Sequence, residues 1–132
     1  MKLPTIRDHM DTVVHTFDPD DDIIETVQSL IDNHVTGAPV VRDDQVVGII
    51  SEKDCLKLLA HGDAQGGRAQ GTVADYMSTE IRSVHPDMNI YFVAGMFLND
   101  HVRRFPVIED GRLVGAITRF DILRIIRELY PD

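Results

Sequence analysis

Two short motifs combine a hydroxyl residue with a carboxylate at a fixed spacing. Residues 48–54 and 115–121 both read glycine, two apolar residues, serine or threonine, two variable residues and aspartate. The pattern predicts a strand that runs into a helix, with Ser51 or Thr118 at the N-cap, where free backbone N–H groups can receive an anion. The aspartate three residues later can accept two hydrogen bonds, such as the neighbouring hydroxyls of a ribose would offer. The same spacing is that of an ordinary capping box, so a purely structural role stays open.

A second pair of segments precedes these motifs and offers different polar groups. Thr36 and Gly37 expose a hydroxyl and backbone, whereas Arg103 and Arg104 at the corresponding place offer two guanidinium groups that suit phosphate. Consecutive arginines are also common on solvated surfaces. Their place directly before an apolar strand, at a duplicated position, favours a role in binding.

The motifs recur because the chain is an internal repeat. Residues 5–61 align with residues 72–128 without a gap, and 17 of the 57 pairs are identical. Neither half, at fewer than about 70 residues, should bury a core unaided. We therefore expect two halves packed about a pseudo-two-fold axis with paired clefts beside it, and functional residues at duplicated positions near that axis.

The residue pattern of each repeat predicts a short helical or turn segment followed by the elements β-α-β-β-α. Asp22, with Glu25 three residues later, and Asn89 are N-caps for the first helix of each repeat. An Asp-Asp or Asp-Gly pair marks each hairpin turn. The expected fold class is α+β, with small mixed sheets flanked by helices. The expected strands are 13–17, 38–42, 46–51, 81–84, 105–109 and 113–118, and the expected final helices are 52–60 and 119–129.

The repeats are separated by a glycine-rich segment. We expect repeat 1 at residues 1–61, a flexible linker at 62–71 and repeat 2 at 72–130. A phosphate-binding glycine loop is the alternative for the linker. That alternative is weaker, because the segment follows a helix rather than a strand and lacks Gly-Lys-Ser/Thr.

The charge and composition exclude several classes of function. The net charge of −9 argues against nucleic-acid binding, and no apolar run approaches a membrane span. Residues 1–67 carry −8 and residues 68–132 carry −1, and every basic residue of the second half is arginine. The single cysteine, Cys55, forms no internal disulfide, and the cytoplasm is the default location.

Neither an enzyme nor a metal centre is expected. The duplicated pair His34 and His101 each follow a helix, which favours a capping or core role. The other four histidines share no metal-ligand spacing, and no Ser-His-Asp or Cys-His arrangement can be argued.

The repeat together with its motifs resembles a pair of cystathionine-β-synthase (CBS) domains. The resemblance rests on Thr-Gly-Ala-Pro-Val at 36–40, Arg-Arg-Phe-Pro-Val at 103–107 and the two Gly-x-x-Ser/Thr-x-x-Asp motifs, and it covers about residues 5–128. In that family two repeats pack into one module that often pairs with another. The clefts bind adenine nucleotides or related adenosyl ligands, with the hydroxyl on phosphate and the aspartate on ribose.

The resemblance implies two sites of unequal charge. Glu52 beside the first hydroxyl disfavours a multiply charged phosphate, whereas Arg119 at the matching position could reach one. The first site would then prefer a monophosphate or an uncharged adenosyl group, or stay empty. The implied residues are Thr16, Thr36, Gly37, Ala38, Ser51 and Asp54 in the first site, and Ser83, Arg103, Arg104, Phe105, Thr118, Arg119 and Asp121 in the second. Because the implied clefts face one another across the axis, the alternative is that Arg103 or Arg104 serves a phosphate anchored by Asp54.

The implied function is that of a non-catalytic regulatory module. It would bind AMP, ADP, ATP or a related adenosyl ligand, form a homodimer and signal occupancy to an unidentified regulated protein by linkage. No cofactor is expected, and Mg²⁺ would enter only with a polyphosphate ligand. The alternative is an oligomerisation scaffold with empty clefts, and an enzyme of unknown type is a third hypothesis.

Overall fold

The structure is a computed structural model that describes residues 3–60 and 71–131. Backbone contacts divide the chain into two compact units, His15–Ile81 and Met1–Val14 with Arg82–Asp132. We call the first the central unit and the second the terminal unit, and each is described by itself. The predicted linker at 62–71 lies outside the described residues except for Gly71, so its role stays a prediction.

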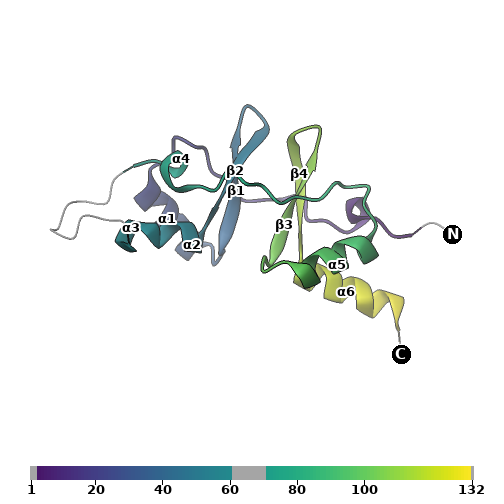
Figure 1. The fold of residues 1–132 in the computed structure, drawn as a ribbon. Helices are drawn as coiled ribbons and strands as arrows, with labels where there is room; N and C mark the ends of the chain where they lie inside the picture. Colours follow the sequence, from purple (N-terminus) through teal and green to yellow (C-terminus); the bar gives the residue numbers. More distant parts are fainter. Residues whose placement is uncertain (1–2, 61–70, 132) are drawn as a thin grey trace. The chain divides into compact units, whose positions relative to one another are not determined.

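Each unit consists of a β-hairpin flanked by short helices (Figure 1). This confirms the α+β class predicted from the sequence. The central unit contains α1 (Ile23–Asp32), β1 (Gly37–Arg42), β2 (Gln45–Ser51), α2 (Glu52–Cys55), α3 (Lys57–Ala60) and α4 (Val73–Tyr76). The terminal unit contains the 3-10 helix η1 (Ile6–Asp8), α5 (Ile90–Asn99), β3 (Arg104–Glu109), β4 (Arg112–Thr118) and α6 (Arg119–Leu129).

The predicted caps begin and end the first helix of the central unit. The side chain of Asp22 accepts the amide hydrogen of Glu25 at 3.0 Å, and Asn89 does the same for Phe92 at 2.9 Å in the terminal unit. At the end of α1, His34 has a φ of 53° and its amide bonds to the carbonyl of Ile31, which closes the helix. His34 therefore caps α1 through its backbone, whereas the exposed side chains of His34 and His101 belong to no core.

Both hairpins have the tight turns that their sequences predict. Gly37 pairs with Ser51 in the central unit, and Arg104 pairs with Thr118 in the terminal unit. The turn residues Asp43 and Asp44 have φ values of 52° and 64°, as a two-residue type I′ turn requires. Each strand begins one residue earlier than predicted.

The predicted strands 13–17 and 81–84 are wrong, because each makes only a single parallel bridge. Phe17 bridges to Val40, and its amide and carbonyl bond to Pro39 and Val41. The next hydrogen bonds of a parallel ladder would need N–H donors from Pro39 and Pro19, which proline lacks. The terminal unit repeats this pattern around Val84. The strands of each hairpin pair antiparallel, and the parallel pairing that a mixed sheet would need is reduced to one bridge in each unit.

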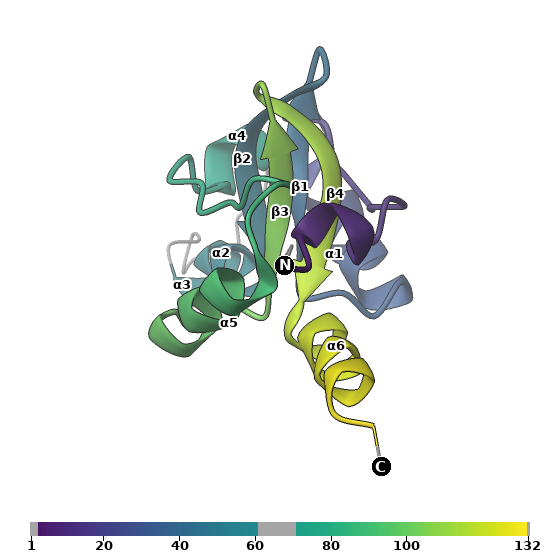
Figure 2. The same cartoon turned by 90° about the vertical axis from the view of Figure 1, so that its right-hand side faces the viewer.

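The predicted helix 52–60 is helical between these bounds but interrupted at Leu56, because α2 ends at Cys55 and α3 begins at Lys57. The matching element of the terminal unit, α6, is continuous and has the predicted bounds. In both views α6 lies beside α5 (Figures 1 and 2).

The second strand of each hairpin pairs with a segment that belongs to the other repeat in sequence. Ile49 exchanges two hydrogen bonds with Ser78, and Ala116 exchanges two with Asp11, all at 2.9 Å. The preceding glycine of each strand permits this approach, because a Cβ on Gly115 would lie 2.7 Å from the Asp11 carbonyl oxygen. Each compact unit therefore contains the short first segment of the other sequence repeat: residues 1–14 belong to the terminal unit, and residues 71–81 belong to the central unit.

Each unit has its own apolar core. Ile23, Val40 and Ile50 are fully buried in the central unit, and Ile6, Phe105 and Ile117 are fully buried in the terminal unit. Ile6 comes from the exchanged N-terminal segment, so the terminal core is complete only when both ends of the chain are present.

Candidate functional site

The motif of the central unit folds into a closed capping box. The amide and the hydroxyl of Ser51 both donate to Oδ2 of Asp54, at 3.0 and 2.9 Å. The amide of Asp54 donates back to the Ser51 hydroxyl oxygen at 3.2 Å. Only 12% of the Asp54 side chain is exposed, so its carboxylate is fixed at the start of α2.

The motif of the terminal unit has the same geometry with one difference. The amide of Thr118 donates to Oδ2 of Asp121 at 2.8 Å, and the amide of Asp121 donates to the Thr118 hydroxyl oxygen at 3.0 Å. In the described part of the chain, the Thr118 hydroxyl has no acceptor, whereas that of Ser51 donates to its aspartate. The Thr118 hydroxyl is therefore free to donate to a ligand.

The expectation that free amides at these helix starts receive an anion is wrong for most of them. The amides of Ser51 and Asp54 serve the capping box, and the amide of Glu52 donates to the Thr36 carbonyl at 2.8 Å. The terminal unit occupies the matching amides in the same way. A phosphate would therefore depend on side chains rather than on the helix start.

The structure brings the two predicted segments of each unit together. Besides the bond from Glu52 to Thr36, Gly37 lies opposite Ser51 in the β1–β2 ladder. In the terminal unit the amide of Arg119 donates to the Arg103 carbonyl at 3.1 Å, and Arg104 lies opposite Thr118. Hairpin entry and helix start therefore form one continuous surface within each unit.

The remaining predicted residues differ in what they present. Thr16 is exposed and Ser83 is half-buried, each directly before the bridging residue of its segment. Ala38 and Phe105 are buried in the cores, and the ring of Phe105 packs 4.6 Å from that of Phe97. Phe105 can therefore offer a ligand its backbone, but its ring belongs to the core.

The predicted cations gather in the terminal unit. Arg104 is half-buried and Arg103 is exposed, and neither has a carboxylate partner among the described residues. Nη2 of Arg119 donates to the carbonyl of Asp100 at 3.1 Å. The central unit has Thr36, Gly37 and Glu52 at these three positions, so the two candidate sites differ in charge as predicted.

Sequence reasoning missed one cation beside each aspartate. Nζ of Lys57 lies 3.3 Å from Oδ1 of Asp54, and Nη1 of Arg124 lies 3.1 Å from Oδ1 of Asp121. Both side chains lie one helical turn after the aspartate. A basic residue at this duplicated position, 57 and 124, was the available signal.

The thiol of Cys55 lies directly after the Asp54 carboxylate. Burial raises the pKa of this thiol, and the negative charge of Asp54 raises it further. Cys55 packs against the central core, which agrees with a structural role.

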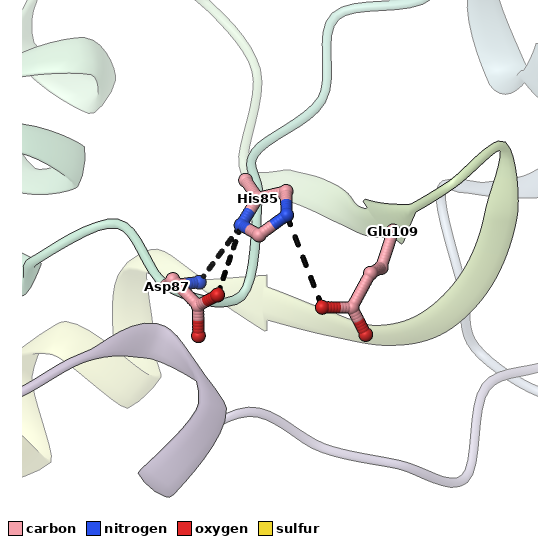
Figure 3. Close-up of side chains that lie close together, drawn as sticks. All are labelled: His85, Asp87 and Glu109. Atoms are coloured by element: carbon pink, nitrogen blue, oxygen red, sulfur yellow. Dashed lines mark hydrogen bonds and ion pairs between the residues drawn. The ribbon is translucent and has the colours of Figure 1, made fainter.

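A second cluster combines His85, Asp87 and Glu109 in the terminal unit (Figure 3). One ligand atom from each lies within 4.8 Å of the others, so the three could hold a metal ion. Nη2 of Arg7 lies 3.1 Å from Asp87 and 2.7 Å from Glu109 and pairs with both carboxylates. Hydrogen bonds to Glu109 and then Asp87 raise the pKa of the Arg7 guanidinium. The central unit places Arg42 against Asp20 at the matching position, so an ion pair accounts for both clusters.

None of the described helices is both long and apolar enough to cross a membrane.

Comparisons with known proteins agree with the duplicated architecture. The model of the CBS domain matches residues 6–61 and 73–128. The uncharacterised protein MJ1232 of Methanocaldococcus jannaschii is 31% identical over 120 residues, which cover 90% of this chain and 38% of that protein. The chain therefore spans about two fifths of the length of this relative.

Two solved structures share the fold over nearly their whole length. CBSX2 of Arabidopsis thaliana, in complex with AMP, matches with a TM-score of 0.82 and 27% identity over 96% of this chain and 98% of that one. The CBS domain pair of protein MJ0100, in complex with 5′-methylthioadenosine and S-adenosyl-L-methionine, matches with a TM-score of 0.78 and 25% identity. It covers 97% of this chain and 99% of that one.

Proposed function

Because the chain belongs to the CBS domain family, we propose that it is a regulatory module without a reaction of its own, which binds adenine nucleotides or related adenosyl ligands. The observation that carries the proposal is the duplicated carboxylate of Asp54 and Asp121. Each is fixed by a capping box through Oδ2, and its Oδ1 accepts no backbone hydrogen bond among the described residues. A rigid acceptor of this kind suits the neighbouring hydroxyls of a ribose. The AMP and adenosyl complexes of CBSX2 and MJ0100 support the ligand class.

We assign the phosphate-bearing ligand to the terminal unit. Among the described residues the Thr118 hydroxyl has no acceptor. Arg104 lies opposite Thr118, and the backbones of Arg103 and Arg119 are joined by a hydrogen bond, so three cationic residues are close in the fold. In the central unit the Ser51 hydroxyl already donates to Asp54, and Glu52 adds a negative charge. The central site therefore favours an uncharged adenosyl group or a monophosphate, or stays empty. Mg²⁺ would accompany only a polyphosphate.

In this proposal the module signals ligand occupancy to a partner protein through thermodynamic linkage between ligand binding and partner binding. A ligand that binds one conformation more tightly than another shifts the population towards it, and a protein that recognises that conformation changes the ligand affinity reciprocally. The regulated protein and a cytoplasmic location belong to the same proposal. Pull-down experiments with and without AMP would test the first, and cell fractionation the second.

We also propose that the protein forms a homodimer through its helices. Large apolar side chains are exposed on α5 and α6 of the terminal unit, and Phe92, Phe120 and Leu123 are each more than half exposed. Exposed apolar groups concentrated on two adjacent helices are typical of a protein interface. Sedimentation of the wild type and of a Phe120→Glu variant tests this, because a dimer interface there predicts a shift to monomer.

Isothermal titration of ligand-stripped protein with AMP, ADP, ATP and S-adenosylmethionine tests the proposed function. We expect saturable binding of at least one ligand, lost in Asp121→Ala for the phosphate-bearing ones. Asp75→Ala is the matched control, because Thr72 and Asp75 form the same capping box at α4 and belong to neither predicted site. If neither the wild type nor the control bound any of these ligands, and both were shown to be folded, the scaffold hypothesis would be favoured. Turnover of a bound nucleotide would favour the enzyme hypothesis.

A further inference from the structure

The carboxylate oxygen that a ribose would need is already in contact with a side chain in both units. Oδ2 of Asp54 accepts two hydrogen bonds from Ser51 and Oδ2 of Asp121 accepts one from the Thr118 amide, so Oδ1 is the oxygen that the capping box leaves to other donors. That oxygen lies 3.3 Å from Nζ of Lys57, and the matching oxygen of Asp121 lies 3.1 Å from Nη1 of Arg124. The sequence places a cation at this point twice, at positions 57 and 124, although it changes from lysine to arginine.

Both cations have a second partner besides the aspartate. Nζ of Lys57 lies 3.4 Å from the carbonyl oxygen of Tyr76, and the guanidinium carbon of Arg124 lies 4.7 Å from the ring centroid of Phe120. The Lys57 and Arg124 side chains are 46% and 58% exposed, whereas their aspartates are only 12% and 14% exposed. Each cation can therefore leave its aspartate for its other partner and for water, while the aspartate stays fixed.

We propose that Lys57 and Arg124 compete with the ribose hydroxyls for Asp54 and Asp121, and so set the ligand affinity of each site. The inference rests on the proposed function, since it assumes that these aspartates bind a ribose. In this proposal a ribose diol takes the place of the cation at Oδ1, and the loss of the ion pair opposes binding. Loss of the cation therefore strengthens binding, whereas loss of a residue that contacted the ligand would weaken it.

The magnitude follows from the exposure of the pairs. Ion pairs with one half-exposed partner contribute little, so their loss should tighten binding by about two- to fivefold. The ligand for the test is adenosine, because it is uncharged and a lost positive charge cannot act on it through phosphate. The gain should be absent for 2′,3′-dideoxyadenosine, which has no hydroxyls to bind the freed oxygen.

Calorimetric titration of adenosine into the full chain and its Lys57→Met and Arg124→Met variants tests the proposal. Lys53→Met is the matched control, because it removes the same charge from the preceding helix, α2, and Lys53 forms no ion pair with Asp54 among the described residues. We expect about two- to fivefold tighter binding in the first two variants and wild-type affinity in the control. In an Asp54→Asn background, Lys57→Met should give no further gain.

Suppose that the wild type binds adenosine and that Lys57→Met and Arg124→Met bind it with equal or lower affinity. That result would overturn this inference but not the proposed function. An equal gain in Lys53→Met, or with 2′,3′-dideoxyadenosine, would also overturn it, because net charge rather than the ribose contact would then explain the effect. If neither wild type nor any variant bound an adenosyl ligand, the proposed function itself would fall and this inference with it.

Discussion

Replacement of Gly115 by alanine tests the exchange of segments within the terminal unit. A Cβ at this position would lie 2.7 Å from the Asp11 carbonyl oxygen and 2.8 Å from Sδ of Met10. The sulfur can move, but the carbonyl is backbone and accepts the amide hydrogen of Ala116 at 2.9 Å. An alanine must therefore push the N-terminal segment away from β4 and lengthen the two bonds that hold it.

The expected cost is about 2 kcal/mol in the free energy of unfolding. Overpacking costs about 1–3 kcal/mol, and each weakened hydrogen bond adds up to about 1 kcal/mol. The smaller conformational freedom of unfolded alanine offsets about 0.4–1 kcal/mol of this. For a chain of this size the midpoint of thermal unfolding should fall by about 8 °C.

Urea unfolding followed by circular dichroism measures the effect, with Gly95→Ala as the matched control. Gly95 lies inside α5, and a Cβ there meets nothing within 4 Å. That variant should gain about 1 kcal/mol from helix propensity. Gly48→Ala should cost less than Gly115→Ala, because its nearest neighbour, at 2.5 Å, is the flexible sulfur of Met77.

A Gly115→Ala variant as stable as Gly95→Ala would refute the reasoning. It would mean that residues 10–11 do not pack against β4 in solution, and that the N-terminal segment does not complete the terminal unit.

Three further predictions concern single positions in the central unit. Glu52→Arg should tighten ATP binding by about fivefold at low salt, because it replaces a negative charge beside Ser51 with a positive one. Glu128→Arg, on the last turn of α6, makes the same change of charge and should leave ATP affinity unchanged. Equal effects of the two variants would contradict a local charge effect. Cys55 should react with iodoacetamide more slowly than free cysteine at pH 8.5, since burial and then Asp54 raise its pKa and so lower the thiolate fraction. Asp54→Asn removes the second cause and should speed the reaction, and a slower rate would contradict this. Asp44→Gly should stabilise the hairpin by about 0.5 kcal/mol in urea unfolding, because Asp44 has a φ of 64°; destabilisation would contradict the turn type.

The sequence predicts the local structure well where a single segment determines it. The caps at Asp22 and Asn89, the turns at residues 43–44 and 110–111, and the bounds of α6 follow from residue types a few positions apart. The first strands were over-predicted, because Val13 and its neighbours have strand propensity. A longer parallel ladder at residues 13–17 would need a backbone N–H donor at residue 39. Proline lacks this donor, and Pro39 lies more than twenty residues away in the sequence.

The site could be predicted only in part for the same reason. Residues 36–37 and 51–54 were predicted as parts of one site, and their contact within one unit follows from hairpin register. The engagement of Asp54 by Lys57, the burial of the Phe105 ring and the approach of Arg7 to Glu109 depend on side-chain placement. The pairing of each repeat's first segment with the hairpin of the other repeat is likewise a tertiary contact. Alignment of the two repeats does not reveal it.

The most direct test of the proposed function is the AMP affinity of Asp121→Ala beside that of Asp75→Ala. Both variants lose a capping-box aspartate, so a general effect on folding would appear in both. The proposed ribose contact predicts that Asp75→Ala binds AMP like the wild type, whereas Asp121→Ala loses at least about tenfold in affinity. Equal affinity in the two variants would show that Asp121 is only a helix cap and would contradict the proposed nucleotide site.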